Sequence, residues 1–196
     1  VKAQTPLSLL YKDQPVMETF HCSSAIKTVA KPNCNILENL DNNQLHDFWI
    51  LVINSILATD MSQHQKIIEE VSRRTGDGKL DLTNPQNRAS LLKVIIKLAD
   101  LSNLFRPFDT ASSWASTLVE ECFSQGDEEQ KLGIGFTSPM NDRNSLELAK
   151  SQVSFLLTCG LPLVSVGVKA VPAFKPIDDQ FQENIDKWKT IVKEQK

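Results

Sequence analysis

The sequence has few of the features that mark secreted, membrane-spanning or nucleic-acid-binding proteins. Its cysteines include no CxxC pair and have no regular spacing: Cys22, Cys34, Cys122 and Cys159. This pattern argues against a disulfide framework and predicts reduced thiols in an intracellular protein, either cytoplasmic or nuclear. No apolar run approaches the length that spans a bilayer, and the first residues differ from a signal peptide, so no membrane partner is expected.

Positive charge is also scarce, because 21 lysines and arginines stand against 24 aspartates and glutamates, a net charge of −3. A nucleic-acid partner needs a basic surface that neutralises phosphates, so this charge argues against one. A small anionic ligand remains open, because a single metal site can outweigh the global charge. The 41% of hydrophobic and 23% of charged residues are ordinary for a globular chain.

Alternation of the β type does not persist anywhere in the sequence, whereas helical periodicity runs nearly throughout. The second half of residues 43–58 is apolar on most sides, which predicts a central helix. Residues 125–142 are expected to be mostly loop, with a short acidic helical turn. No linker divides the chain, so one all-α domain is predicted over residues 1–196. The chain does not begin with Met, and we expect it to start inside a longer polypeptide. Apolar spacing and prolines predict helices over residues 5–11, 15–30, 43–58, 61–74, 86–102, from Pro107 onward, 144–159 and 179–195.

One carboxylate ends an otherwise apolar stretch, "SLLKVIIKLADLSNLF", in the helix predicted over residues 86–102. Lys93, Lys97 and Asp100 follow one another at spacings of four and three, so they could form an ordinary solvated stripe on that helix. On pattern alone this interpretation is favoured, because charged groups are seldom buried without a partner. A role for Asp100 therefore needs support from the rest of the chain.

Other signals of catalysis are weak in this sequence. His21, His46 and His64 lie outside any HExxH motif or histidine pair, so we expect that this chain alone does not supply all the ligands of a metal site. Gly133 and Gly135 lack the preceding strand and following helix of a phosphate loop. What remains is a set of polar residues at the ends of apolar helices.

These polar residues belong to six ordered strings: "YKDQPVMETFH", "LATDMSQH", "ADLSNLFRP", "EECFSQGDEE", "SPMNDR" and "SQVSF". The strings resemble the catalytic domain of the class I cyclic nucleotide phosphodiesterases, which carries "YNDxSVLExHH", "LATDMSKH", "ADLSNPxxP", "EEFFxQGDxE", "SPMCDR" and "SQVGF" in the same order. The resemblance covers residues 5 to 192. It implies a compact, multi-helix, all-α catalytic domain of the HD-domain type. The departures from the family strings favour a divergent member, similar to fungal cyclic-AMP phosphodiesterases.

The resemblance also implies a reaction and its cofactors. Family members hydrolyse 3′,5′-cyclic nucleotides to 5′-monophosphates with two divalent metals, zinc and magnesium or manganese, which are bridged by the attacking hydroxide. A histidine protonates the departing 3′ oxygen. In the family that histidine and most metal ligands lie upstream of "YND", in HNxxHA and HDxxH motifs. The resemblance therefore implies that this chain lacks them, lacks the N-terminal helices, and has the upstream part of its own catalytic domain as a partner.

Three residues take metal-related roles from the resemblance. Asp100 matches the aspartate that binds the tightly held metal, usually zinc, for which an anionic oxygen is a suitable ligand. Glu18 and Thr59 match positions that hydrogen-bond metal-bound waters. Without the resemblance, Glu18 would be an ordinary glutamate in the first turn of a helix and Thr59 an ordinary cap.

Further residues take substrate-binding roles from the resemblance. Gln152 and Phe155 are three residues apart and share one helix face, so a carboxamide that can pair with a purine edge lies beside a ring that can stack on it. Helix statistics alone favour a core phenylalanine and a surface glutamine. In the family these positions hold the purine. Relatives with asparagine at the position of Asn103 mostly prefer the adenine nucleotide, so the resemblance favours cyclic AMP over cyclic GMP. Other matches to pocket-lining positions are Met61, Leu118, Met140 and Phe123.

Two alternatives remain open at this stage. The chain could belong to a non-catalytic helical module that binds nucleotide or a protein partner, in which case the upstream sequence would lack the HNxxHA and HDxxH motifs. It could also belong to another helical metal hydrolase with the HD signature, but such a protein would not require "SQVSF" or "LATDM".

Overall fold

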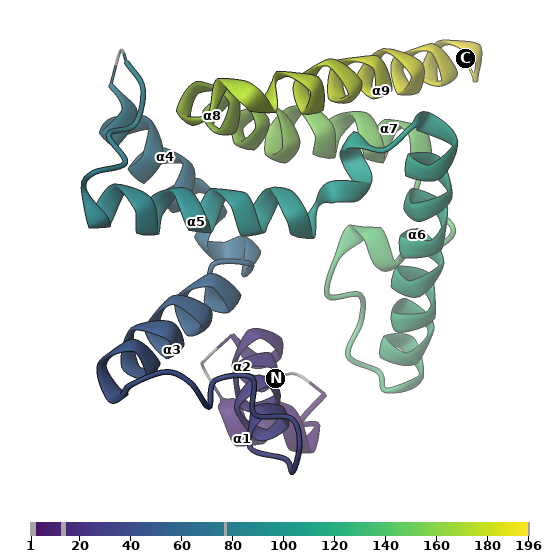
Figure 1. The fold of residues 1–196 in the computed structure, drawn as a ribbon. Coiled ribbons are helices and arrows are strands. Elements are labelled where there is room, and N and C mark those ends of the chain that lie inside the picture. Colours follow the sequence, from purple (N-terminus) through teal and green to yellow (C-terminus); the bar gives the residue numbers. More distant parts are fainter. Residues whose placement is uncertain (1–2, 13–14, 77, 196) are drawn as a thin grey trace. The chain divides into compact units, whose positions relative to one another are not determined.

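The computed structural model describes residues 3–12, 15–76 and 78–195, and these residues are helical with no β-strand among them (Figure 1). The prediction of an all-α fold is therefore confirmed. The described residues form two compact units, one over residues 3–100 and the other over residues 101–195. The single domain over residues 1–196 stays a prediction.

The first unit contains helices whose starts follow the sequence signals. Pro6 stands in the first turn of its helix, and the side chain of Asp41 accepts from the backbone of Asn43 and Gln44 in a capping box. The helices predicted for this part of the chain are confirmed within a few residues. They are α1 (Pro6–Tyr11), α2 (Val16–Val29), α3 (Asn42–Leu57), the 3-10 helix η1 (Met61–Gln63), α4 (His64–Thr75) and α5 (Pro85–Asp100).

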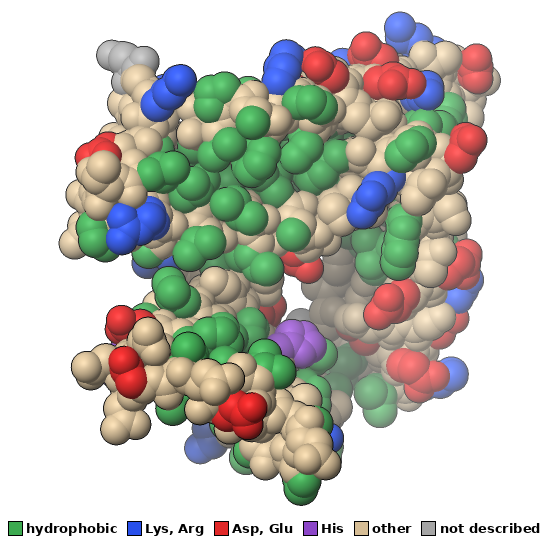
Figure 2. Space-filling model, in the orientation of Figure 1, with side chains coloured by type: hydrophobic (Ala, Val, Ile, Leu, Met, Phe, Trp, Pro, Cys, Tyr) green, Lys and Arg blue, Asp and Glu red, His purple; other side chains and the backbone are tan. Residues whose placement is uncertain are grey.

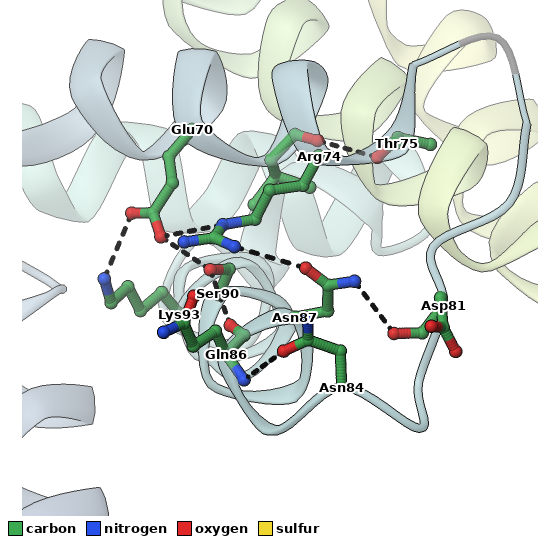
Figure 3. Close-up of polar contacts among 10 residues, drawn as sticks. Glu70, Arg74, Thr75, Asp81, Asn84, Gln86, Asn87, Ser90 and Lys93 are labelled. Atoms are coloured by element: carbon green, nitrogen blue, oxygen red, sulfur yellow. Dashed lines mark hydrogen bonds and ion pairs between the residues drawn. The ribbon is translucent and has the colours of Figure 1, made fainter.

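Helices α4 and α5 lie side by side and are joined by polar side chains (Figure 3). Glu70 accepts from Ser90 Oγ at 2.6 Å, from Lys93 Nζ at 3.1 Å and from Arg74 Nε at 3.3 Å. Burial alone would raise the pKa of Glu70, but the hydrogen bonds from Ser90 and Lys93 and the positive charges lower it. Arg74 also donates to Asn87, and this hydrogen bond joins the C-terminal end of α4 to the N-terminal end of α5.

Helix α3 differs from its prediction. It packs against α2 and α5, but none of its residues is buried in the part of the chain that the structure describes. Hydrophobic side chains gather over α3 and α5 on the face drawn in Figure 2, and Ile50, Leu51, Leu92 and Ile95 are exposed. The prediction of a central α3 is therefore wrong for these residues, because two neighbours cover only part of its apolar circumference.

The second unit is built around a long C-terminal helix. This helix packs against α7, α8 and α6, and its side chains of Phe181, Ile185 and Trp188 are buried. The ring of Phe181 makes an edge contact with Phe105, and that of Trp188 makes one with Phe108. The elements are the 3-10 helix η2 (Ser102–Phe105), α6 (Phe108–Lys131), the 3-10 helix η3 (Pro139–Asn141), α7 (Leu148–Phe155), a π-helical turn (Leu156–Gly160), α8 (Leu161–Ala170), the 3-10 helix η5 (Pro172–Phe174) and α9 (Lys175–Glu194).

Helix α6 is longer than the sequence predicted. Residues 125–131, expected to be mostly loop, form its last two turns. Side-chain bonds at helical spacing stabilise this polar end, because Gln125 donates to Glu129 and Lys131 pairs with Glu128. The short acidic helical turn expected in this segment is therefore part of α6. The extent of the helix was underestimated, because a charged stretch without apolar periodicity resembles a loop.

Helices α7 and α8 are continuous through the π-helical turn, so the helix predicted over 144–159 begins at Leu148 and does not end at 159. The wider turn precedes Pro162, which lacks a backbone donor.

Residues 148–170 form one continuous helical stretch that is long and apolar enough to cross a membrane by length and composition. The prediction that no apolar run approaches that length is therefore wrong. This is weak evidence for a span, because a buried core helix meets the same criterion, and here Leu156, Leu163 and Val164 are buried.

Candidate functional site

Asp100 is the last residue of α5, and its side chain is exposed. Its carboxylate makes no hydrogen bond or ion pair with any residue that the structure describes. A negative charge at a helix C-terminus opposes the helix dipole, so helix stability does not explain this aspartate. The interpretation of Lys93, Lys97 and Asp100 as a solvated stripe is correct for Asp100, which is exposed. It is wrong for Lys97, which is buried. Lys93 forms an ion pair with Glu70.

Glu18 lies in the first turn of α2 and is half-buried. An acidic residue there is favourable by itself, so the interpretation as a first-turn glutamate agrees with the structure. The residue also borders a cavity of about 670 Å³ that is lined by residues of α2, α3, η1, α4 and α5. The ionisable side chains around this cavity are Glu18, Asp60, Lys66, Glu70 and Lys93. Contact of Glu18 with a metal-bound water stays a prediction.

Thr59 lies in the turn between α3 and η1. Its hydroxyl Oγ1 donates to the carbonyl oxygen of Ile56 at 2.8 Å, and its backbone N–H donates to the same oxygen at 3.1 Å. The N-cap of η1 is Asp60, which accepts from Ser62 N at 2.8 Å, so the interpretation of Thr59 as a cap is wrong. Because the hydroxyl proton is already donated, the lone pairs of Oγ1 remain as acceptors for a water. Met61 begins η1 and is exposed.

Asn103 lies in η2, at the start of the second unit, and is half-buried. The segment around it is held by Asn184 of α9, whose side chain is 1% exposed. Asn184 Nδ2 donates at 2.9 Å to the carbonyl oxygens of both Leu104 and Arg106. These bonds satisfy backbone acceptors on either side of the end of η2 and fix the position of the segment that carries Asn103.

Leu118 and Phe123 lie on α6 in different surroundings. Leu118 is exposed, as is Trp114 one turn earlier. Phe123 is half-buried, and the guanidinium of Arg143 lies over its ring, 5.1 Å from the centroid. Arg143 is also bonded to Asp127. Phe123 therefore has one face of its ring already covered by Arg143, while Leu118 remains accessible.

Met140 lies in η3, whose position is set by Glu129 of α6. The Glu129 carboxylate accepts from Gln125 Nε2 at 2.8 Å, from the backbone N–H of Thr137 at 2.8 Å and from Asn141 Nδ2 at 3.0 Å, and the Thr137 hydroxyl also donates to it. The hydrogen bonds from Gln125, Thr137 and Asn141 lower the pKa of Glu129 to about 2.

Gly126 allows this close approach of η3 to α6. A Cβ atom at position 126 would lie 2.0 Å from the carbonyl oxygen of Asn141, so any other residue would push the segment away. The glycine of "QGDEE" is therefore explained by packing, with no need for an unusual backbone conformation.

Gln152 and Phe155 lie on α7, one turn apart on the same face, as predicted. Gln152 is 6% exposed, so the interpretation as a surface glutamine is wrong. Its carboxamide makes no hydrogen bond to any residue in the described part of the chain. Phe155 is half-buried and not part of the core. The amide nitrogen and oxygen of Gln152 are not fully buried, so a ligand or a water can reach and bond them.

The described residues contain no group of three or more histidine, cysteine, aspartate or glutamate side chains that could hold a metal ion. Asp100 is one suitable oxygen ligand, but a stable site for zinc needs several converging ligands. The residues present here therefore do not by themselves fit a complete metal centre. Within the described part of the chain, Cys22, Cys34, Cys122 and Cys159 form no disulfide.

Residues 1–181 of the chain match the family described as 3′5′-cyclic nucleotide phosphodiesterase. The chain belongs to this family. The prediction from the six ordered strings is therefore confirmed, whereas the similarity to fungal members stays a prediction.

The relatives include proteins from two animals. The chain is 32% identical over 202 residues to "Probable 3′,5′-cyclic-AMP phosphodiesterase pde-4" of Caenorhabditis elegans, which covers 100% of this chain and 30% of that protein. It is 33% identical over 199 residues to "3′,5′-cyclic-AMP phosphodiesterase, isoform F" of Drosophila melanogaster, which covers 98% and 30%. The chain thus spans less than a third of the length of these curated relatives.

Solved structures agree with the fold. The phosphodiesterase domain of the RhoPDE fusion protein from the choanoflagellate Salpingoeca rosetta matches with a TM-score of 0.92 and 27% identity, over 98% of this chain and 62% of that one. A second structure of the phosphodiesterase domain of the Salpingoeca rosetta rhodopsin phosphodiesterase matches with a TM-score of 0.91 and 28% identity, over 98% and 59%. The predicted phosphodiesterase catalytic fold is confirmed.

Sequence reasoning missed three buried polar residues that hold the segments carrying the predicted site residues: Lys97, Glu129 and Asn184. Glu129 and Asn184 lie in polar stretches that resemble solvated helix faces, and Lys97 has the spacing of a surface stripe. The only signal for Glu129 was its place in the "QGDEE" string. No signal in the sequence distinguished Asn184.

The pKa of Glu129 predicts how stability responds to acid. A carboxylate with a lowered pKa stabilises the folded state above its ordinary pKa of about 4.3, and this contribution is lost as the pH falls toward 2. We expect Glu129→Gln to unfold at lower denaturant concentration at pH 7 and to lose less stability than the unsubstituted protein between about pH 4.5 and 2. Glu128→Gln, an exposed neighbour, is the matched control. Equal slopes of stability against pH for Glu129→Gln and the unsubstituted protein would contradict the assignment.

Proposed function

We propose that the protein to which this chain belongs hydrolyses 3′,5′-cyclic nucleotides to 5′-monophosphates and prefers cyclic AMP. Family membership supports the reaction class, and the names of the nematode and fly relatives support the adenine nucleotide. The observation that carries the proposal is the carboxamide of Gln152, which makes no hydrogen bond to the described residues although the residue as a whole is only 6% exposed. It is available as donor and acceptor for a purine edge.

Phe155 supports the same assignment. Its ring is half-buried and one helical turn from Gln152, so a purine that pairs with the carboxamide can lie against the ring. Stacking of a base on an aromatic side chain contributes about 1–3 kcal/mol in nucleic-acid sites. Hydrogen bonding and stacking from one helix face would together orient the base.

The proposed cofactors are two divalent metals, zinc with magnesium or manganese, with Asp100 as one ligand. Bound metals would supply positive charge to the cyclic phosphate and activate water. Within this chain, the role of Asp100 is to present an unpaired carboxylate at the end of α5, and the role of Thr59 is to offer acceptor lone pairs to a water. A cytoplasmic or nuclear location and the absence of nucleic-acid and membrane partners also stay predictions.

The direct test is turnover by the complete protein with cyclic AMP and with cyclic GMP, in the presence of zinc and magnesium. The proposal expects hydrolysis of both with the larger kcat/KM for cyclic AMP. Nucleotide binding without turnover would instead support the non-catalytic module. Turnover that is faster with cyclic GMP would contradict the assigned preference.

Asp100→Ala separates function from stability. We expect kcat/KM to fall by more than about 10²-fold, because a metal ligand is lost. The free energy of unfolding should be unchanged or rise by about 0.3–1 kcal/mol, because a negative charge leaves the C-terminal end of α5. Metal content, steady-state kinetics and denaturant unfolding measure the three effects.

The matched control for Asp100→Ala is Asp186→Ala, which removes an exposed carboxylate from α9. This control should leave kinetics unchanged. Near-normal turnover with normal metal content in Asp100→Ala would contradict the assignment of Asp100.

Gln152→Leu tests recognition of the base. The substitution keeps an apolar side chain, one atom shorter, and removes the amide, so we expect KM to rise by roughly tenfold, about 1–2 kcal/mol, with a smaller change in kcat. The stability of the protein should not fall, because no internal hydrogen bond of the described residues is lost. Ser154→Ala on the exposed face of α7 is the control. Unchanged kinetics on both cyclic nucleotides would show that Gln152 does not contact the base.

A further inference from the structure

Lys97 is a buried cation in the interior of the first unit, with a side chain that is 1% exposed. Its Nζ donates to the carbonyl oxygen of Ala58 at 3.1 Å and to those of Thr59 and Asp60 at 3.4 Å each. The Met61 sulfur lies 3.9 Å from the same nitrogen. One ammonium group of α5 thus contacts four consecutive residues of the turn that follows α3.

The physical reason for this contact lies at the end of α3. The helix ends at Leu57, and carbonyl groups at a helix C-terminus have no intrahelical donor. An ammonium has three N–H groups, and a positive charge is favourable near the negative end of the helix dipole. A buried charge is tolerated only when it is well hydrogen-bonded. The turn therefore cannot shift away from Lys97 without breaking these hydrogen bonds to a buried ammonium.

The turn held in this way carries Thr59 and Met61. The carbonyl of Thr59 contacts Lys97, while its hydroxyl and its backbone N–H both donate to the carbonyl oxygen of Ile56. All three polar groups of Thr59 are thus bonded, and the direction of the free lone pairs on Oγ1 is fixed. The position of Thr59 depends on the hold of Lys97 on the surrounding backbone.

The same lysine lies three residues before Asp100 on α5. Residues at this spacing are neighbours on a helix surface, about 4.5 Å apart along the axis. We propose that Lys97 is a positioning residue, which holds the Thr59 turn in register with the Asp100 carboxylate. This role rests on the proposed function, because it places an acceptor for a water at a fixed position relative to a metal ligand. Lys97 itself does not contact substrate.

The test substitution is Lys97→Met in the complete protein, which keeps an unbranched chain of similar volume and removes the charge and all three donors. We expect the backbone amides of residues 58–61 to exchange hydrogen about tenfold faster or more. We also expect kcat for cyclic AMP to fall by about 10²-fold, because a misplacement near 1 Å can cost that much. KM should stay within about threefold, because no group that contacts substrate is removed. Metal content should be unchanged.

The matched control is Asn87→Ala, a buried polar residue at the other end of α5. Asn87 donates to the carbonyl oxygen of Asp81 and accepts from Arg74, so its loss also breaks two hydrogen bonds. This control should lower stability and leave kcat and the exchange of residues 58–61 unchanged. An equal loss of kcat in the control would overturn the positioning role in favour of general destabilisation.

Unchanged exchange at residues 58–61 in Lys97→Met would overturn the proposal, as would unchanged kcat. If Lys97→Met does not fold, Lys97→Gln, which keeps an amide donor, is measured in the same way. Failure of both variants to fold would overturn positioning in favour of a purely structural role. Absence of turnover in the unsubstituted protein would contradict the proposed function, whereas the exchange rates test the hold of Lys97 on the turn separately.

Discussion

Backbone groups at the ends of helices need hydrogen-bond partners, and buried polar side chains supply them at three places in this chain. The ammonium of Lys97 holds the turn after α3, and the amide of Asn184 holds the end of η2. The carboxylate of Glu129 holds the segment before η3 through the N–H of Thr137. Each of these segments carries predicted site residues: Thr59 and Met61, Asn103, and Met140. Within each unit, the positions of these residues therefore depend on polar contacts made inside that unit.

Stability and function make opposite demands at two other positions. Asp100 puts a negative charge at the unfavourable end of α5, and the amide of Gln152, a residue that is largely buried, makes no hydrogen bond to the described residues. Glu129, by contrast, is satisfied by several donors and has a lowered pKa. A satisfied polar group that fixes a segment is explained by the fold alone. Asp100 and Gln152 have no such role in holding a segment, which is why they carry the functional assignment and Glu129 does not.

The all-α fold could be predicted from helical periodicity and prolines, with α1, α2, α4 and α5 correct within a few residues. The extension of α6 to Lys131 could not, because its last turns are held by side-chain bonds and not by an apolar face. The continuity of α7 and α8 was also missed, because a π-helical turn accommodates Pro162 where a proline normally indicates a helix end.

The site residues were predicted from ordered strings, since single residues gave only ordinary interpretations. The structure places Asp100 at a helix end and Gln152 and Phe155 on one helix face, and their roles stay predictions. Lys97 could not be predicted, because its spacing from Lys93 and Asp100 is that of a solvated stripe. Only the tertiary contact with the carbonyls after α3 shows that its charge is buried.

The most direct test of the central claim is a crystal structure of the complete protein with zinc and 5′-adenosine monophosphate bound. The account predicts a metal ion about 2.0–2.2 Å from a carboxylate oxygen of Asp100. It also predicts the Gln152 carboxamide within about 2.7–3.2 Å of the purine edge, with the base against Phe155. A metal held without Asp100, or a base bound away from α7, would contradict the account.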